Sequence, residues 1–404
     1  MWLLNKSFIT ENKSLRCLLI ARVSTFLAFQ MLAVAVGWQI YSLTQMPLYL
    51  GLVGLVQFLP MLLFTFIVGH VADRYNRKIV VCISEIIESI GIFTLAFASY
   101  HGWINKETIL IAVFFIGTAN AFQGPCMQSI LPNIVRKEVF PKAAAIMASA
   151  SQFAVIIGPG LGGFLYALGP SVVYSISGVL ALLASVVISF ISMEKRTVKQ
   201  EAATLKSMFA GVDFIKKNPI ILGAISLDLF AVLLGGATAL LPIYASKILI
   251  VGPFGLGVLR STPAVGALLM SFILAKKPLR KKVGHIMFTA VIFFGISTII
   301  FAISTSIIIS LAALFVLGAC DVISVVIRST LVQIRTPDDM RGRVSSVNSM
   351  FIGTSNELGE FESGVLASWL GVVPAALLGG IGTIVVVIIW MKLFPELLKA
   401  DKLQ

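Results

Sequence analysis

Residues 69–78 read GHVADRYNRK, a short charged stretch that separates two long apolar segments at roughly 48–68 and 79–98. Each segment is about as long as the ~20 residues that a helix needs to cross a bilayer. Because so few residues connect them, the two helices are expected to be antiparallel neighbours. The Arg and Lys residues of the connection predict that it lies on the cytoplasmic side of a membrane.

The same apolar pattern continues along the whole chain. Of 404 residues, 58% are hydrophobic and only 12% are charged, whereas about 25% are charged in a soluble protein. These values favour a polytopic membrane protein over a soluble domain with one anchor. We expect twelve spans, at approximately 16–43, 48–70, 79–99, 107–131, 142–167, 171–193, 219–242, 253–275, 284–304, 307–333, 343–368 and 372–394.

The net charge of +13 follows the expected topology. Lys106 and Lys247 fall in loops on the outer side, and Arg22, Arg260 and Arg328 fall inside spans; the other basic residues lie in the inner loops and termini. This asymmetry predicts that both termini are cytoplasmic and that the inner face attracts anionic lipid. It explains the charge without a nucleic-acid partner. The expected location is the inner (plasma) membrane.

The chain divides into two similar halves. The predicted domains are residues 1–193, a linker at 194–218 and residues 219–404. In the linker, Leu205, Met208, Phe209, Val212 and Ile215 recur at helical spacing, which predicts an amphipathic helix on the inner membrane surface; a flexible linker is the alternative. The halves share similar segments: residues 131–145 read LPNIVRKEVFPKAAA, and residues 331–345 read LVQIRTPDDMRGRVS. The connection at 276–284 corresponds in position to the one at 69–78 but lacks its Asp. Such repeats are typical of transporters built from two six-helix halves.

The pattern G-x-x-A-D-R-x-x-R-K at 69–78 resembles the signature of the major facilitator superfamily, which lies between helices 2 and 3. The resemblance implies an all-α membrane fold of twelve transmembrane helices in two six-helix halves. It also implies a gate on the cytoplasmic side, in which Asp73 faces the start of helix 11. The residues assigned to this gate are Gly69, Asp73, Arg74, Arg77, Lys78, Arg341 and Arg343.

GPGLGG at 158–163 has the spacing of a dinucleotide fingerprint but lies within a membrane-length helix, so we exclude that reading. It resembles the G-P-x-x-G-G motif in helix 5 of exporters of the same superfamily. Gly158, Gly162 and Gly163 would allow close helix packing, and Pro159 would permit a bend. Plain tight packing explains the same residues. Asn120, near Gln123-Gly124, stands where proton-coupled drug antiporters carry an Arg, which sets this chain apart from that subgroup.

Charged residues inside the spans are the best independent indication of a site, since ionisable side chains at membrane depth are costly and usually face a cavity or each other. From these we assign Arg22, Asp228, Arg260, Asp321, Arg328, Glu357 and Glu360 to substrate binding or coupling. Arg260 is the expected counter-charge of the acids, and a static ion pair between Arg260 and Asp321 is the alternative reading. The remaining acids at depth are Glu85, Glu88 and Glu362.

Three C-terminal blocks, at 257–269, 321–349 and 351–364, resemble the branch of the superfamily that contains the enterobactin siderophore exporter and macrolide efflux pumps. The resemblance implies a secondary active exporter of a small amphipathic molecule, in the first place a siderophore, driven by a proton gradient and acting as a monomer. Multidrug or macrolide efflux is the alternative.

A channel or membrane-embedded enzyme is the reading least supported by the sequence. The chain contains no P-loop, HExxH motif or nucleophile elbow. Its four cysteines have neither disulfide nor metal spacing, and its three histidines do not cluster. We therefore expect no metal, no cofactor and no catalytic residue.

Overall fold

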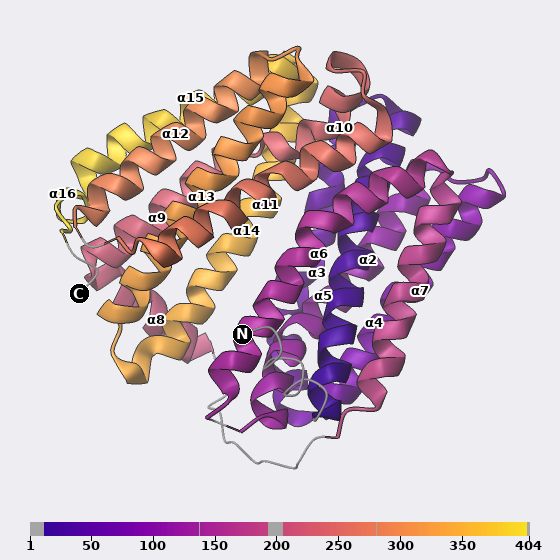
Figure 1. The fold of residues 1–404 in the computed structure, drawn as a ribbon, viewed down its shortest axis with the longest axis horizontal. Helices are drawn as coiled ribbons and strands as arrows, with labels where there is room; N and C mark the ends of the chain where they lie inside the picture. The colour runs from indigo at the N-terminus through magenta and orange to yellow at the C-terminus, as the bar shows by residue number, and fades with distance from the viewer. Residues whose placement is uncertain (1–11, 137, 193–204, 280, 402–404) are drawn as a thin grey trace. The chain divides into compact units, whose positions relative to one another are not determined.

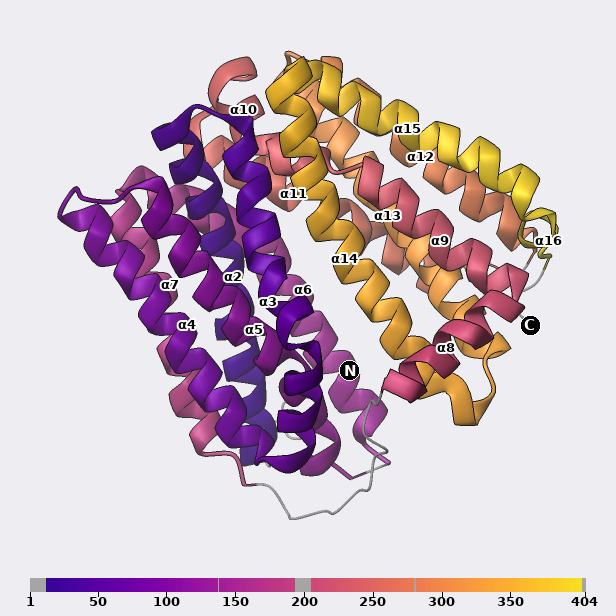
Figure 2. The same cartoon turned by 180° about the vertical axis from the view of Figure 1, so that it is seen from behind.

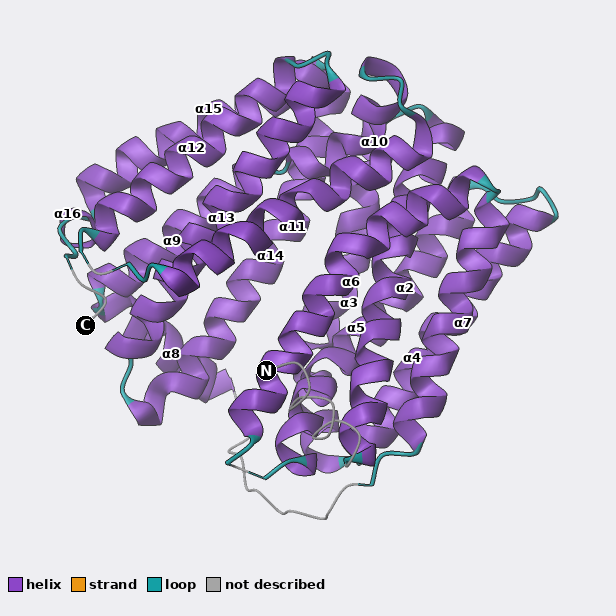
Figure 3. Cartoon of the chain, in the orientation of Figure 1, coloured by secondary structure: helices purple, strands orange, loops and turns teal. Residues whose placement is uncertain are grey.

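The computed structural model describes residues 12–136, 138–192, 205–279 and 281–401. Within helices, the side chains of Phe66, Ala72, Asp73, Asp339 and residues 205–209 lie outside this description. The described residues form helices joined by short connections, with no strand among them (Figure 3). They group into two units: one holds residues 1–44, 56–202 and 256–258, and the other holds 45–55, 203–255 and 259–404.

The helices of the first unit are long enough to span a membrane. They are α2 (Lys13–Thr44), α3 (Pro47–Arg74), α4 (Arg77–Tyr100), α5 (Lys106–Ile134), α6 (Phe140–Ala167) and α7 (Pro170–Ser189), and the first residues of α3 group with the second unit. Only Tyr75 and Asn76 separate α3 from α4, and the Asn76 side chain accepts a hydrogen bond from the backbone N–H of Lys78 at 3.0 Å. The antiparallel pair predicted around this connection is therefore present, with longer helices than expected. Figures 1 and 2 show α4 and α7 running side by side.

The helices of the second unit follow the same pattern with one interruption. They are α8 (Leu205–Lys217), α9 (Pro219–Leu234), α11 (Gly252–Lys276), α12 (Val283–Ile303), α13 (Ile307–Arg335), α14 (Asp338–Leu370), α15 (Val372–Leu393) and α16 (Pro395–Leu398). Between α9 and α11 lie a 3₁₀ turn at Ala237–Leu240, a short α10 at Leu241–Ile243 and a π-helical turn at Tyr244–Ile248.

Eleven helical segments of the described chain are apolar and long enough to cross a membrane. The twelfth expected span corresponds to α14, which is 33 residues long but carries several charged residues along its length. Each of the twelve expected spans is thus helical and close to its predicted place, and eleven of them are apolar enough to cross a membrane.

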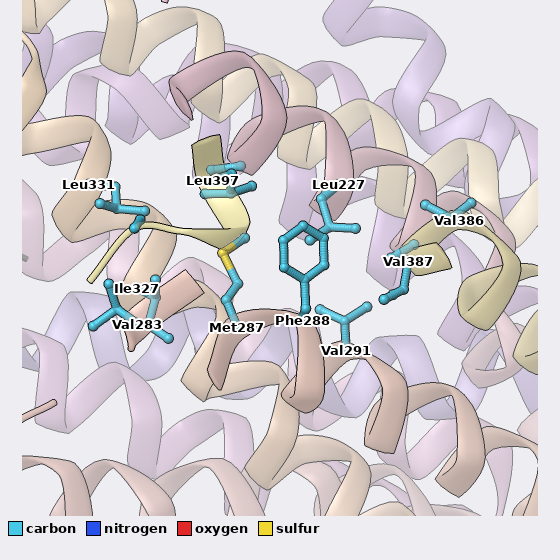
Figure 4. Packing of buried hydrophobic residues seen from close by; sticks show 13 residues of the cluster. Leu227, Val283, Met287, Phe288, Val291, Ile327, Leu331, Val386, Val387 and Leu397 are labelled. Atoms are coloured by element: carbon cyan, nitrogen blue, oxygen red, sulfur yellow. The ribbon is translucent and has the colours of Figure 1, made fainter. Parts of the chain in front are cut away.

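The core of the second unit is formed where α12 meets its neighbours. Phe288 and Met287 of α12 pack against Leu227 of α9, Ile327 of α13 and Val387 of α15 (Figure 4). All five are buried. This packing fixes α9 and α13, the two helices that carry the buried charges described below.

α8 forms as predicted, but its apolar face has a different partner. Val212 and Ile215 pack with Ile221, Val344 and Val347 of the second unit, while Lys216 and Lys217 are exposed. A Cβ on Gly211 would lie 3.0 Å from the carbonyl oxygen of Arg343. The apolar face of the described part of α8 therefore packs on protein, whereas the sequence predicted that it would face lipid. The amphipathic pattern alone does not distinguish these two apolar surroundings.

Candidate functional site

An ion pair lies inside the second unit between α9 and α13. Nη1 of Arg328 donates to Oδ2 of Asp228 at 2.5 Å, and the two residues are only 3% and 6% exposed. Nε of Arg328 has no hydrogen-bond partner. A buried pair of this kind is costly to form and costly to break from one side. The pair joins two of the residues that the sequence assigned to the site.

Asp321 lies beside this pair. The groups that act electrostatically on it include Asp228 and Arg328. Asp228, Asp321 and Ser324 line a small cavity together with apolar side chains of α9 and α12, and the hydroxyl of Ser324 is buried without a partner. The cavity is about the size of a single water molecule. Asp321 thus lies within electrostatic reach of Arg328, and no ion pair between Asp321 and Arg260 is recorded among the described residues.

A second group of charges involves α14. Arg260 of α11 acts electrostatically on both Glu357 and Glu360, which agrees with its expected role as counter-charge. A Cβ on Gly54, in the part of α3 that groups with this unit, would lie 3.1 Å from Oε2 of Glu360 and 3.5 Å from Oε2 of Glu357. Both carboxylates therefore lie against a helix surface that has no side chain at this point. Unlike Asp228, the two glutamates are only half-buried.

The break after α9 lies close to these glutamates in the chain fold. A Cβ on Gly236 would overlap the carbonyl oxygen of Gly359 and lie 2.7 Å from Oγ of Ser363. A larger residue would thus force the 3₁₀ turn and α14 apart. Interrupted helices are typical of transporter binding sites. The pair Gly235-Gly236 was the signal in the sequence, although the expected span ran through it to residue 242.

Arg22 of α2 has partners in the first unit. Its Nε donates to Oγ of Ser151 on α6 at 2.8 Å, and its guanidinium lies 5.3 Å from the ring centroid of Phe26. The half-buried side chain is held between helices. It extends toward α6, whereas an arginine that snorkels would extend toward the membrane surface.

Two buried acids of α4 were not assigned to the site from the sequence. Glu85 and Glu88 are both 0% exposed. Glu85 accepts hydrogen bonds from the hydroxyl of Thr25 on α2 and from Nε2 of Gln123 on α5, the latter at 2.5 Å. Their i, i+3 spacing was a signal that the sequence offered, but only the fold reveals the polar side chains from α2 and α5.

The glycine motif brings α6 close to α2. A Cβ on Gly158 would lie 2.6 Å from Cβ of Gln30, and one on Gly162 would lie 2.8 Å from Cα of Met31. α6 continues as a helix through Pro159, and Gly158, Pro159, Gly162 and Gly163 are all buried. The close packing that explains these glycines is present, while a part in conformational change stays a prediction.

The expected gate residues lie in two units, which are described separately. Nζ of Lys78 donates to the carbonyl oxygens of Ser189, the last residue of α7, and of Ile191 just beyond it, at 3.1 and 3.0 Å. In the other unit Arg341 pairs with Asp338 at 2.6 Å. Gly69 and Arg74 lie in the last turns of α3 and Arg77 opens α4, whereas Arg343 lies in the first turns of α14. The side chain of Asp73, and with it the predicted contact, lies outside the described residues.

The comparisons with known proteins agree with this architecture. The model of the Major Facilitator Superfamily matches residues 18–360. The chain belongs to this superfamily. It is therefore a multi-span membrane transporter of small molecules and not an enzyme.

Similar curated proteins include enterobactin exporters. The one from Citrobacter koseri is 24% identical over 404 residues, with 98% of this chain and 95% of that protein covered. The one from Escherichia coli O1:K1 is 23% identical over 402 residues, with the same coverage.

Among solved structures, a bacterial homologue of the human lysosomal transporter Spinster, inward-facing and occupied, aligns with a TM-score of 0.74 at 15% identity over 97% of this chain and 96% of its own. The nucleoside transporter NupG aligns with a TM-score of 0.69 at 16% identity, over 94% and 98% of the two chains. Both likenesses support the fold.

Proposed function

We propose that this protein is a secondary active exporter of a small amphipathic molecule, in the first place a siderophore, and that a proton gradient drives it by alternating access. The observation that carries the substrate class is the similarity to enterobactin exporters over nearly the full length of both chains. The buried charges of both units support the coupling, because ionisable groups at membrane depth usually serve a substrate or proton pathway.

The proposed topology follows from the charge pattern. The protein would lie in the inner membrane as a monomer with both termini in the cytoplasm, since its basic residues concentrate in the loops of one side. The 69–78 connection would then be cytoplasmic. Asp73, at the end of α3, would stabilise the outward-facing state by contacting the start of α14, where the helix N-terminus carries a partial positive charge.

The substrate and coupling residues have different proposed roles. Arg22 would meet an anionic group of the substrate, because a planar guanidinium binds such groups with two hydrogen bonds. Glu357 and Glu360, half-buried near Arg260, would respond to the arrival of substrate or proton. Asp228, Asp321 and Arg328 would hold α9 and α13 together at the same centre.

The test is export of a named siderophore. The chain is expressed in Escherichia coli cells that lack their own enterobactin exporter, and enterobactin in the cells and in the medium is measured by mass spectrometry. We expect the chain to lower the retained enterobactin and raise the secreted amount, and Glu357→Gln to fail at equal membrane abundance. Unchanged retention would contradict the siderophore proposal. Unchanged retention together with increased macrolide resistance would instead support the multidrug alternative.

A further inference from the structure

The first unit contains a group of buried polar side chains around Glu85 and Glu88 that the proposed coupling residues do not include. Thr25 of α2 and Gln123 of α5 both donate to Oε1 of Glu85. Glu88 lies one turn further along α4, and Asn120 one turn back along α5 from Gln123. Because α4 and α5 run antiparallel, Glu88 and Asn120 lie at the same level. Three helices thus contribute side chains to one buried place.

The acceptors of this group outnumber its donors. Oε2 of Glu85, both carboxyl oxygens of Glu88 and Oε1 of Gln123 are buried without a hydrogen-bond partner. Among the described residues of this unit, the buried donors recorded without a partner are Nδ2 of Asn120 and the hydroxyl of Ser177 on α7, fewer than the four acceptors. Buried polar groups are nearly always hydrogen-bonded, so this many orphaned acceptors require an explanation. The Gln123 side chain is 4% exposed. Because its amide nitrogen donates to Glu85, its unpartnered amide oxygen lies close to the Glu85 carboxyl group.

No cation of the described chain neutralises the two carboxyl groups. Arg22, the basic residue of α2 nearest to Thr25, bonds to Ser151 on α6, and Lys78 at the start of α4 bonds to carbonyl groups at the end of α7. Among the other titratable groups on the packed helices, Cys126 of α5, Tyr174 of α7, which donates to Gln39, and Cys82 and Tyr41 are uncharged in their usual form. The remaining charged side chains of these helices lie in their first turns, away from Glu85 and Glu88; they are Lys13, Arg16, Arg77, Lys106 and Glu107.

The two carboxyl groups also act on each other electrostatically. Two negative charges one helical turn apart, fully buried and without a counter-ion, are strongly unfavourable. A single bound proton removes one charge and supplies one of the missing donors. Glu85 already receives two hydrogen bonds that support its charge, while Glu88 receives none, so Glu88 is the better place for the proton.

We propose that Glu85 and Glu88 form a proton-binding site in the first unit, in which the Glu88 carboxyl binds the proton and Glu85 stays ionised, supported by Thr25 and Gln123. In this step an O–H bond forms on a Glu88 carboxylate oxygen, and on release the proton returns to water. The inference deepens the proposed proton-driven export and rests on it for its part in transport. Proton binding itself does not depend on the identity of the substrate.

The test measures the carboxyl groups directly. The purified full-length protein in lipid nanodiscs is titrated with acid and base, and the infrared C=O band of protonated carboxyl groups is followed. We expect Glu88→Gln to remove one pH-dependent component of this band. The matched control Glu362→Gln, a membrane acid of the second unit, should keep that component. The same band in wild-type protein and in Glu88→Gln would overturn the proposal.

Two further arms keep the result interpretable. Thr25→Val removes the hydroxyl that bonds to Glu85 with little change in shape, so it should move the pH at which the component titrates; no movement would contradict the shared site. Titration of wild-type protein in sodium and in choline buffer should give the same curve, and displacement of the component by sodium would assign the site to that ion instead. This titration needs no siderophore, so its result stands even if the export assay fails. If instead the titrating component is absent from the wild-type protein, the export assay still decides the proposed function.

Discussion

The two units stabilise their buried acidic side chains in different ways. In the second unit, Asp228 is bonded to Arg328 at 2.5 Å, and Glu357 and Glu360 lie within electrostatic reach of Arg260. In the first unit, Glu85 and Glu88 are more deeply buried but have no basic partner in the described chain. The second unit balances acids with bases, whereas the first supports its acids only with neutral donors.

This difference separates groups that hold the fold from groups that exchange ligands. A carboxylate paired to an arginine carries its neutralising partner through every state of the protein. An unpaired buried carboxyl is neutralised by a proton or cation from outside, which it can release without breaking an ion pair. The half-buried Glu357 and Glu360 lie between these extremes, since their counter-charge is near but no ion pair within 4.0 Å joins them to it among the recorded bridges.

The largest effect is expected from breaking the buried pair. Asp228→Asn leaves Arg328 charged and unpaired inside the second unit, and losing one partner of a buried pair costs about 3–5 kcal/mol. We expect a large loss of folded protein, measured by thermal unfolding in detergent and by yield from the membrane.

The same helix bundle offers a matched control. Asp213 and Lys217 of α8 form a pair at 2.6 Å, but both side chains are more than half exposed. Asp213→Asn should cost no more than about 1 kcal/mol, as exposed pairs do. Equal losses in the two variants would contradict the expectation that burial makes the Asp228–Arg328 pair costly to break.

The next effect concerns response to the proton gradient. Glu357→Gln mimics the protonated carboxyl permanently, so the variant should bind substrate but fail to move it against a gradient. Transport of enterobactin into proteoliposomes, with and without an imposed pH gradient, measures this. Glu362→Gln on the same helix is the control and should behave as wild type. If Glu357→Gln keeps the wild-type response, Glu357 is structural.

A smaller effect is expected at the connection 69–78 and its counterpart 276–284, which also differ between the halves. The 69–78 connection has Asp73, while its counterpart at 276–284 has only basic residues. Asp73→Asn should slow transport but leave membrane insertion intact, because a hydrogen bond to a charged group contributes about 1.5–3 kcal/mol. Transport rate at equal membrane abundance is the measurement. A normal rate would reject the gating role of this residue.

The smallest change is expected from Arg22→Lys. The substitution keeps the charge and a charged hydrogen bond but loses the planar fork of donors, so we expect the loss of one ordinary hydrogen bond, about 0.5–1.5 kcal/mol, or roughly two- to tenfold in affinity. Affinity for enterobactin is measured by titration calorimetry on purified protein. Ser151→Ala, which removes the partner of Arg22 and keeps the guanidinium, is the control. Equal affinity in Arg22→Lys and wild type would place Arg22 outside the substrate site.

The sequence was sufficient for the fold because apolar length and charged connections act locally. The expected spans and the short connection between the second and third of them follow from these features, whereas the family was indicated by the motif at 69–78. Partnerships between helices did not follow: Arg328 is 100 residues from Asp228, and Thr25 is 60 residues from Glu85. Depth along a span places two charges at one level but does not give their direction around the helix. For that reason Asp321 was set against Arg260, and Glu85 and Glu88 were left out of the site.

The most direct test of proton-driven export uses the wild-type protein alone. Purified protein is reconstituted into liposomes, a pH gradient is imposed, and enterobactin movement and internal pH are recorded together. We expect enterobactin to move against its own gradient while protons move the other way, and a protonophore to abolish both movements. Enterobactin movement that is unchanged by the pH gradient and by the protonophore would contradict proton-driven export.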